Sequence, residues 1–255
     1  MASKKILQGT NRRGLTLQKP IIFVGPSLSH QKARKIFDAD YRAPAKKGDL
    51  LMLSSTAFDM SHNESNSTIY VGLIDGLFLQ DYPPTPIEVY QLLANKKFRV
   101  IGGASLGALR AMELERFGMI GIGKVFELFK YGATDQDDEV AVTFYPSQEK
   151  ESTEKQEKET QSEAMVDIRY NLFIAYKKNI ISERTKRLTA RTAKATYFPY
   201  RYYSNIIEKT RVKYPDLSGE LASFSSYLED HRQSLKEHDA VKIIKYIKEA
   251  YEKKP

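Results

Sequence analysis

A serine flanked by glycines is the residue whose type and spacing best fit nucleophilic chemistry in this sequence. The pattern Gly103-x-Ser105-x-Gly107 follows a strand-like run over residues 98–101 and opens a helix-like run. This spacing is that of a nucleophile elbow, in which a serine stands on a sharp turn between a strand and a helix. The free N–H groups of the first helical turn would face an anion beside Ser105. The alternative is a serine that only caps the helix.

Short apolar runs that end in polar turns predict the strands that position this serine. We expect strands over residues 21–24, 49–54, 69–74 and 99–102, with a helix over residues 84–97. Strands that alternate with helices and lack regular hairpin turns indicate βαβ units. The expected fold class is therefore α/β, with a Rossmann-like, mostly parallel sheet and a C-terminal helical region.

Three polar turns follow the predicted strands. They contain Gly25-Pro26-Ser27, Asp75 and Ala104-Ser105. Since ligands of open α/β sheets bind beyond the carboxyl ends of the strands, we expect these turns to line one pocket. There the carboxylate of Asp75 could activate water or orient the serine. The backbone N–H of Leu106 could form part of an oxyanion site.

The glycine-flanked serine also belongs to an ordered set of short motifs. They occupy residues 24–28 (VGPSL), 74–78 (IDGLF), 103–114 (GASLGALRAMEL), 117–123 (FGMIGIG), 137–142 (DDEVAV) and 164–169 (AMVDIR). Together and in this order they closely resemble the TfuA-like family. The resemblance covers about residues 20–203 and is densest over residues 72–142.

The resemblance implies a sulfur-supplying partner of a YcaO-type enzyme in peptide-backbone thioamidation. Such a protein would hydrolyse the thiocarboxylate of a ThiS-like carrier protein and release sulfide, so it would be a thiocarboxylate hydrolase. The resemblance gives catalytic roles to Ser105, Asp75 and Glu88. We expect substrate binding by further residues of the motifs and turns, namely Gly25, Pro26, Ser27, Ala104, Leu106, Arg110, Glu113, Asp138 and Arg169.

The general base is the missing part of this chemistry. His30 lies just past the first predicted strand. His231 would complete the order serine, acid, histidine with Asp137 or Asp138 as the acid. The family often has a histidine two positions before the residue that matches Glu88, where this chain has Pro86. Two alternatives therefore stay open. One is a non-catalytic adaptor that docks carrier or substrate peptide onto the YcaO enzyme, and the other is an unrelated serine hydrolase.

An acidic run raises the question of a metal. Asp137, Asp138 and Glu139 are consecutive, and hard cations prefer clustered oxygen ligands. Neighbouring residues on an extended chain point to opposite faces, so no more than two of them could easily share an ion. We expect neither a metal nor a cofactor.

The composition narrows the function classes. The chain of 255 residues has no cysteine, which excludes disulfides, thiolate metal sites and a persulfide carried by the protein itself. Its net charge of +8 favours acidic partners, and no zinc-finger or RNP signature points to nucleic acid. No apolar run approaches the about 20 residues that span a membrane. Residues 1–8 are basic without an apolar segment behind them, so we expect a cytoplasmic protein.

Four regions are expected along the chain. Residues 1–19 would be a basic N-terminal tail, residues 20–147 the α/β core, residues 148–163 a charged linker or mobile loop, and residues 164–255 a helical region packed on the core. The linker is expected because residues 148–163 include no apolar side chain and cannot bury surface. The oligomeric state does not follow from the sequence.

Overall fold

The computed structural model describes residues 9–10, 16–59, 68–77, 82–143 and 162–253. Its contacts divide the chain into two compact units. Unit 1 comprises Met1–Ala133 and Glu237–Pro255, and unit 2 comprises Thr134–Lys236. Each unit has a hydrophobic core of its own. The boundaries expected from the sequence stay predictions, and most of the expected linker, residues 148–161, lies outside the described residues.

Unit 1 is built on a five-stranded sheet in which all neighbouring strands are parallel. Its strands are β3 (Ile21–Phe23), β4 (Asp40–Arg42), β5 (Ile69–Leu73), β6 (Phe98–Gly103) and β7 (Ile120–Ile122). A separate antiparallel pair joins β1 (Gly9–Thr10) to β2 (Thr16–Leu17). The expected α/β fold with a parallel sheet is confirmed.

The order of the strands locates the crevice of the sheet. The order is β4-β3-β5-β6-β7, which is 2-1-3-4-5 when the strands are numbered along the chain. This is the arrangement of flavodoxin-like folds, in which the chain leaves the first strand in one direction and returns on its other side. The topological switch point therefore lies between β3 and β5, whose carboxyl ends carry Ser27 and Asp75.

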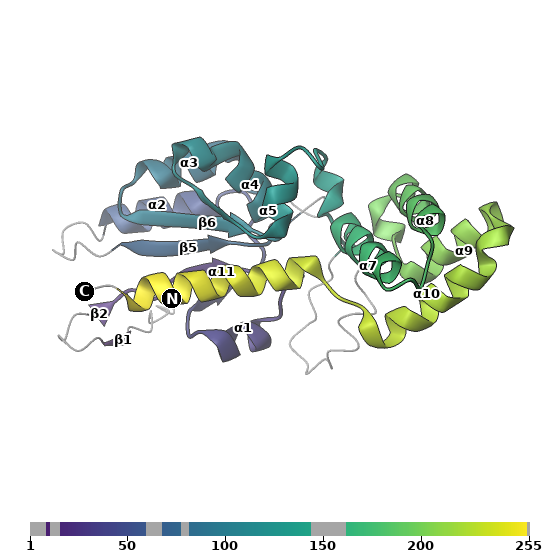
Figure 1. The fold of residues 1–255 in the computed structure, drawn as a ribbon. Helices are drawn as coiled ribbons and strands as arrows, with labels where there is room; N and C mark the ends of the chain where they lie inside the picture. Colours follow the sequence, from purple (N-terminus) through teal and green to yellow (C-terminus); the bar gives the residue numbers. More distant parts are fainter. Residues whose placement is uncertain (1–8, 11–15, 60–67, 78–81, 144–161, 254–255) are drawn as a thin grey trace, which may run out of the picture. The chain divides into compact units, whose positions relative to one another are not determined.

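Helices cover both faces of the sheet (Figure 1). One face packs against α1 (His30–Ile36) and α11 (Leu235–Glu252), and α11 buries Ala240, Ile243, Ile244 and Ile247 in the core of that face. The other face packs against α2 (Asp49–Asp59), α3 (Pro86–Ala94), α4 (Leu106–Leu114) and α5 (Lys124–Lys130), with the 3-10 turn η2 (Glu115–Phe117) after α4.

One expected strand is wrong. Residues 49–54, predicted as a strand from their apolar run, begin the helix α2. The side chain of Asp49 accepts a hydrogen bond from the N–H of Lys46, and the N–H of Gly48 donates to Glu88, so these bonds fix the turn that leads into the helix. Leu and Met side chains, which are not β-branched, favour a helix. The second strand is instead the short edge strand β4.

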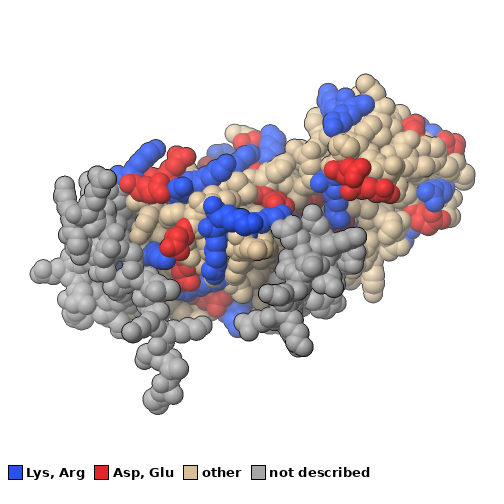
Figure 2. Space-filling view, turned by 90° about the horizontal axis from the view of Figure 1, so that it is seen from below, with Lys and Arg blue, Asp and Glu red and all other residues tan. Residues whose placement is uncertain are grey.

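Charged side chains are mixed on the surface of the molecule. On the face shown in Figure 2, Lys and Arg side chains stand beside Asp and Glu side chains instead of forming one block. Ion pairs such as Lys32–Glu237, at 3.1 Å, and Arg42–Asp40, at 2.8 Å, are part of this mixture. The visible face therefore lacks the single-sign stripe that is typical of nucleic-acid-binding surfaces.

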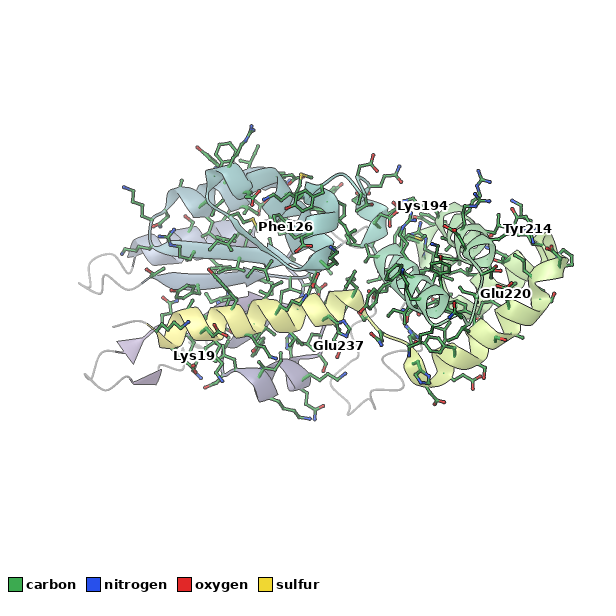
Figure 3. The ribbon with its side chains drawn as sticks, in the orientation of Figure 1. Lys19, Phe126, Lys194, Tyr214, Glu220 and Glu237 are labelled. Carbon is green, nitrogen blue, oxygen red and sulfur yellow. The ribbon has the colours of Figure 1, made fainter. Side chains whose placement is uncertain are left out.

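Unit 2 is helical. It contains α7 (Met165–Lys177), α8 (Glu183–Ala195), α9 (Tyr203–Lys213) and α10 (Ser218–His231), with short 3-10 turns at Asp137–Glu139 (η3), Phe198–Tyr200 (η4) and Pro215–Leu217 (η5). Glu220 of α10, labelled in Figure 3, accepts the N–H of Ser182, whose own hydroxyl caps α8. The expected helical region after residue 164 is confirmed.

The turn that carries Ser105 depends on a close approach of α4 to the sheet. A β-carbon at Gly107 would lie 1.7 Å from the carbonyl oxygen of Leu73, and one at Gly102 would lie 2.3 Å from the carbonyl oxygen of Gly107. The N–H of Gly107 donates to the carbonyl of Ile74 at 3.1 Å. Only glycine allows backbone to meet backbone at these distances, so the glycines of the motif set the position of the helix.

We expect Gly107→Ala to destabilise unit 1 by about 3 kcal/mol or more, because a rigid backbone oxygen occupies the space that the methyl group needs. Gly219→Ala in α10 is the matched control, since nothing lies within 4 Å of its added β-carbon. That control should gain up to about 1 kcal/mol from the higher helix propensity of alanine. Chemical denaturation measures both variants, and equal stabilities would contradict this account of the turn.

Candidate functional site

The strand-to-helix turn before α4 is sharp and strained. Ala104 has a φ of 63°, in the left-handed region that residues with a β-carbon rarely adopt. The N–H of Ser105 donates to the carbonyl of Gly103, only two residues earlier, at 2.7 Å. The strain of the predicted elbow therefore falls on Ala104, which costs about 1 kcal/mol or more. Backbone strain of this size is often found at functional sites.

Ser105 occupies the N-cap position of α4 but does not act as a cap. Its side chain makes no capping hydrogen bond, whereas the side chains of Ser29 and Thr85 cap α1 and α3. The alternative interpretation, a serine that only caps its helix, is therefore wrong. Ser105 is buried, and its hydroxyl is left for another partner.

The N-terminus of α4 offers an anion position beside this hydroxyl. The N–H of Gly107 is taken by Ile74, and the N–H of Ala108 by the carbonyl of Ser105 at 2.9 Å. The N–H of Leu106, at the first helical position, has no acceptor within the helix. Together with the helix dipole it favours negative charge at this point, such as the oxygen of a tetrahedral intermediate.

Asp75 joins the predicted turns after β3 and β5. Its Oδ2 accepts the N–H of Gly25 and the N–H of Ser27, both at 2.9 Å, and its Oδ1 accepts the hydroxyl of Ser27 at 2.6 Å. The carboxylate is buried, and three of its acceptor positions are used. In this structure Asp75 holds the loop after β3, with Pro26 at its tip. Its expected role as a base stays a prediction.

The loop after β3 has the position that binds phosphate in many doubly wound folds. There the N–H groups of the first strand-to-helix turn face the phosphate. Here the N–H groups of Gly25 and Ser27 face the carboxylate of Asp75 instead. This anion position is therefore filled by the protein itself.

Glu88 has structural partners. Its Oε1 lies 3.4 Å from both the N–H and the hydroxyl of Thr85, which completes a capping box at the start of α3. Its Oε2 accepts the N–H of Gly48 at 2.8 Å. Glu88 is buried and ties the first turns of α2 and α3 together. Its catalytic role stays a prediction.

Arg110 and Glu113 form the pair that their spacing predicts. Nη1 of Arg110 donates to Oε2 of Glu113 at 2.8 Å, and its Nε donates to the carbonyl of Pro84 at 2.9 Å. These bonds fasten α4 to the segment before α3. Substrate binding by the two residues stays a prediction.

None of the described histidines is hydrogen-bonded to Ser105. Nε2 of His30 lies 2.8 Å from the carbonyl of Val24 and 3.2 Å from that of Arg42, and because carbonyls only accept, this nitrogen must carry the hydrogen. His231 belongs to unit 2, where its ring stacks on Tyr227. His238 is exposed on α11, and His62 lies outside the described residues.

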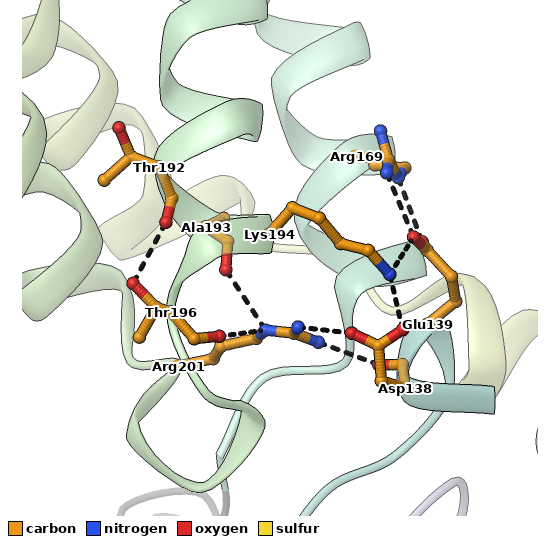
Figure 4. Close-up of polar contacts among 8 residues, drawn as sticks. All are labelled: Asp138, Glu139, Arg169, Thr192, Ala193, Lys194, Thr196 and Arg201. Atoms are coloured by element: carbon orange, nitrogen blue, oxygen red, sulfur yellow. Dashed lines mark hydrogen bonds and ion pairs between the residues drawn. The ribbon is translucent and has the colours of Figure 1, made fainter. Parts of the chain in front are cut away.

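Asp138 and Glu139 are enclosed by cations of unit 2 (Figure 4). Asp138 pairs with Arg201 at 2.6 Å and also with Lys194. Glu139 pairs with Lys194 and Arg169, both at 2.9 Å. Arg201 is only 2% exposed, and its remaining donors reach backbone carbonyls. Thus Asp138 and Arg169, expected to bind substrate, belong to one ionic cluster.

The cluster holds its carboxylates ionised. Burial raises the pKa of Glu139, but the hydrogen bonds from Arg169 and Lys194 outweigh it, and the net pKa lies below its usual value. Asp138 behaves in the same way, with Arg201 and Lys194 opposing the effect of burial. The bidentate contact with Glu139 raises the pKa of Arg169. Within the described ranges no group of three or more His, Asp and Glu side chains is arranged to hold a metal ion.

A comparison with family models decides the relationship of this chain. The model of the TfuA-like protein family matches residues 75–202, which is half of the sequence. The chain belongs to the TfuA-like family. This family is generally associated with YcaO thioamidation systems. No curated protein matches the sequence.

The TfuA-like match begins at Asp75 and ends one residue after Arg201, so it includes residues of both units. The charged residues near its two ends have internal partners: Asp75 bonds to Ser27 in unit 1, and Arg201 pairs with Asp138 in unit 2. Ser105, which belongs to the motif at residues 103–114, makes no capping hydrogen bond with its side chain. Among the described helices of this TfuA-like chain, none is long and apolar enough to cross a membrane.

Sequence reasoning missed a buried carboxylate at the carboxyl end of β7. Asp239 of α11 accepts the N–H of Val125 at 2.7 Å, and a β-carbon at Gly123 would lie 2.3 Å from its carboxyl carbon. Asp239 lies outside the TfuA-like match, in a charged helix where it resembles a surface residue. The available signal was the close pair Gly121-x-Gly123, which is typical of a tight turn but does not indicate the partner of that turn.

Sequence reasoning also missed the role of Asp167 in unit 2. Its carboxylate accepts the hydroxyl of Ser234 and the N–H groups of Leu235 and Lys236, and so caps the start of α11. Burial raises the pKa of Asp167. The neighbouring helical position Asn171 bonds to Gln233 through both ends of its amide. Both residues stabilise the same loop.

We expect Asp75→Asn to lower the free energy of unfolding by about 2–3 kcal/mol, because an amide has one acceptor oxygen where the carboxylate has two. Ser105→Ala should change it by less than about 1 kcal/mol, since no capping bond is lost. Urea denaturation measures both. A large loss of stability in Ser105→Ala would show that its hydroxyl has a structural role.

The ionic cluster gives a pH-dependent prediction. Because the folded-state pKa of Glu139 is lowered, its contribution is present above the unfolded value of about 4.3 and is lost as the pH falls through the folded value. Glu139→Gln should therefore be less stable than the wild type by about 3 kcal/mol at pH 7, with a gap that narrows below about pH 4. Unfolding curves from pH 7 to pH 3 test this, and a constant gap would contradict it.

Proposed function

We propose that this chain supplies sulfur to a YcaO enzyme by hydrolysing the thiocarboxylate of a ThiS-like carrier protein. The observation that carries the proposal is Ser105, which stands at the N-terminus of α4 without capping it. Membership of the TfuA-like family supports the pathway. The absence of cysteine supports release of sulfide from another carrier over transfer through the protein's own thiol.

The reaction starts with attack of Ser105 on the thiocarboxylate. Its Oγ forms a bond to the carbonyl carbon, and the negative oxygen of the tetrahedral intermediate lies against the N–H of Leu106 and the helix N-terminus. The carbon–sulfur bond then breaks. The serine proton goes to the departing sulfur, which leaves as hydrosulfide, and the carrier remains as an ester on Ser105. No histidine is needed, because the sulfur of the substrate accepts the proton.

The second half-reaction restores the enzyme. Water adds to the ester carbon, the carbon–oxygen bond to Ser105 breaks, and the carrier leaves with an ordinary carboxylate. One proton from water returns to the serine oxygen, and the other goes to solvent. The Asp75–Ser27 pair keeps the neighbouring loop in place during both steps, since its hydrogen bonds do not involve Ser105.

An adaptor without chemistry is the second candidate function. It is favoured by the internal partners of Asp75, Glu88, Arg110 and Glu139, which leave no described acid or base bonded to Ser105. Such an adaptor would bind the carrier at the same turn and present it to the YcaO enzyme. The two functions differ in what the protein does alone with the carrier.

Sulfide release from purified thiocarboxylated carrier, without the YcaO enzyme, tests the proposal. We expect release by the wild type and a loss of at least about 100-fold in Ser105→Ala, because the nucleophile is removed. Ser29→Ala is the matched control, since that serine does cap its helix. It should lose about 1 kcal/mol of stability and keep its activity.

Mass spectrometry of the reaction distinguishes the nucleophile. An ester between the carrier and Ser105 should accumulate at short times. Sulfide release that persists in Ser105→Ala would show that water attacks directly. No release by the wild type, with intact stimulation of the YcaO enzyme, would establish the adaptor.

A further inference from the structure

Large apolar side chains are exposed on the helices that cover one face of the sheet in unit 1. Ile87 is 68% exposed, Tyr90 47%, Phe117 45% and Leu51 43%. They belong to α2, α3 and the turn η2 after α4. Contiguous exposed apolar surface is uncommon on isolated proteins and marks a place where another molecule binds.

We infer that these four side chains belong to one surface, the α2–α3 patch. The hydrogen bond from Gly48 to Glu88 brings the first turn of α2, with Leu51, to the first turn of α3. Ile87 and Tyr90 are three residues apart and share a face of α3. The ring of Tyr90 meets the ring of Phe117 edge to face, with centroids 5.1 Å apart.

The charge around the α2–α3 patch is positive. Lys46, Lys96 and Arg116 are exposed beside α2, α3 and Phe117, and they form no ion pair with the described residues. The carboxylates of Glu113 and Glu115 are already paired with other cations. Asp49, at the start of α2, accepts the N–H of Lys46, so among the described residues the border of the patch carries more cations than unpaired carboxylates.

This charge pattern selects the kind of partner. A second copy of the chain would bring two cationic borders together, and like charges placed face to face disfavour association. The patch fits a different protein, one with an apolar centre surrounded by carboxylates. Such a pairing resembles ordinary protein interfaces, with an apolar core and a polar border.

The patch extends to the edge of the sheet that carries Ser105. Helices that connect parallel strands run opposite to them, so α2, α3 and α4 all begin at the carboxyl edge (Figure 1). Leu51 and Ile87 lie in the first turns of α2 and α3. A partner seated on these turns lies beside the N-terminus of α4.

We propose that the α2–α3 patch is the docking surface for the folded body of the carrier protein, whose C-terminal tail then reaches Ser105. This inference rests on the proposed function and adds the surface that selects the substrate. Apolar contacts of the body provide the affinity, and the cationic border orients it. The tail alone is then a poor substrate.

Binding of the carrier in its ordinary carboxylate form tests the docking surface, because no turnover occurs. Isothermal titration calorimetry should show that Ile87→Glu and Tyr90→Glu each raise Kd at least tenfold. Arg116→Glu should raise Kd about threefold to tenfold at low salt and less at high salt. Tyr131→Glu is the matched control, since Tyr131 is 75% exposed on another helix end, and it should bind within twofold of the wild type.

The outcomes separate the docking surface from the chemistry. A carrier shortened at its tail should still bind and should stay sensitive to Tyr90→Glu. Patch variants that fold and bind the carrier like the wild type would overturn the docking proposal. Variants that bind the carrier normally and lose only their binding to the YcaO enzyme would overturn it as well. Patch-dependent binding without sulfide release by the wild type would overturn the proposed function and leave the docking surface standing.

Discussion

The contact between Gly107 and the carbonyl groups at the end of β5 determines where the rest of the site lies. It places the first turn of α4 directly on the sheet, with the N–H of Gly107 on Ile74. The chain must therefore reverse within two residues after β6, and Ala104 takes the strained conformation. Ser105 consequently stands next to the Asp75 turn with its hydroxyl unused by the helix. One backbone contact thus sets both the strain at Ala104 and the position of Ser105.

Much of unit 1 could be predicted because its signals are local. Apolar runs ended by Gly or Asp identified β3, β5 and β6, and the strand ends brought Ser27 to Asp75 as expected. The run at residues 49–54 was misleading because Glu88, which fixes the turn before α2 through Gly48, is far along the chain. Asp239 and Val125 are 114 residues apart, and no local sequence pattern indicates such a contact. Contacts of this kind require the fold.

The ionic cluster shows a limit of motif reasoning about charge. Asp138 and Arg169 both belong to signature motifs, and the sequence alone suggested that they face a substrate. The structure connects both residues to Lys194 and Glu139, within a group whose charges largely cancel. A charged residue of a family motif can form an ion pair within the protein instead of binding a ligand. Removing one partner of a buried ion pair costs much of the free energy of unfolding. The stability of the fold is therefore reason enough for both residues to be present.

The carboxylate of Asp75 accepts hydrogen bonds from the N–H groups of the loop after β3, which bind a phosphate in many doubly wound folds. The side chain of Asp75 therefore takes the place of a bound anion at the topological switch point of the sheet. The carboxyl edge of the sheet is held by hydrogen bonds within the protein, so its order does not depend on a bound nucleotide. The N–H groups of Gly25 and Ser27 are therefore satisfied within the protein, by a carboxylate that cannot dissociate from the chain.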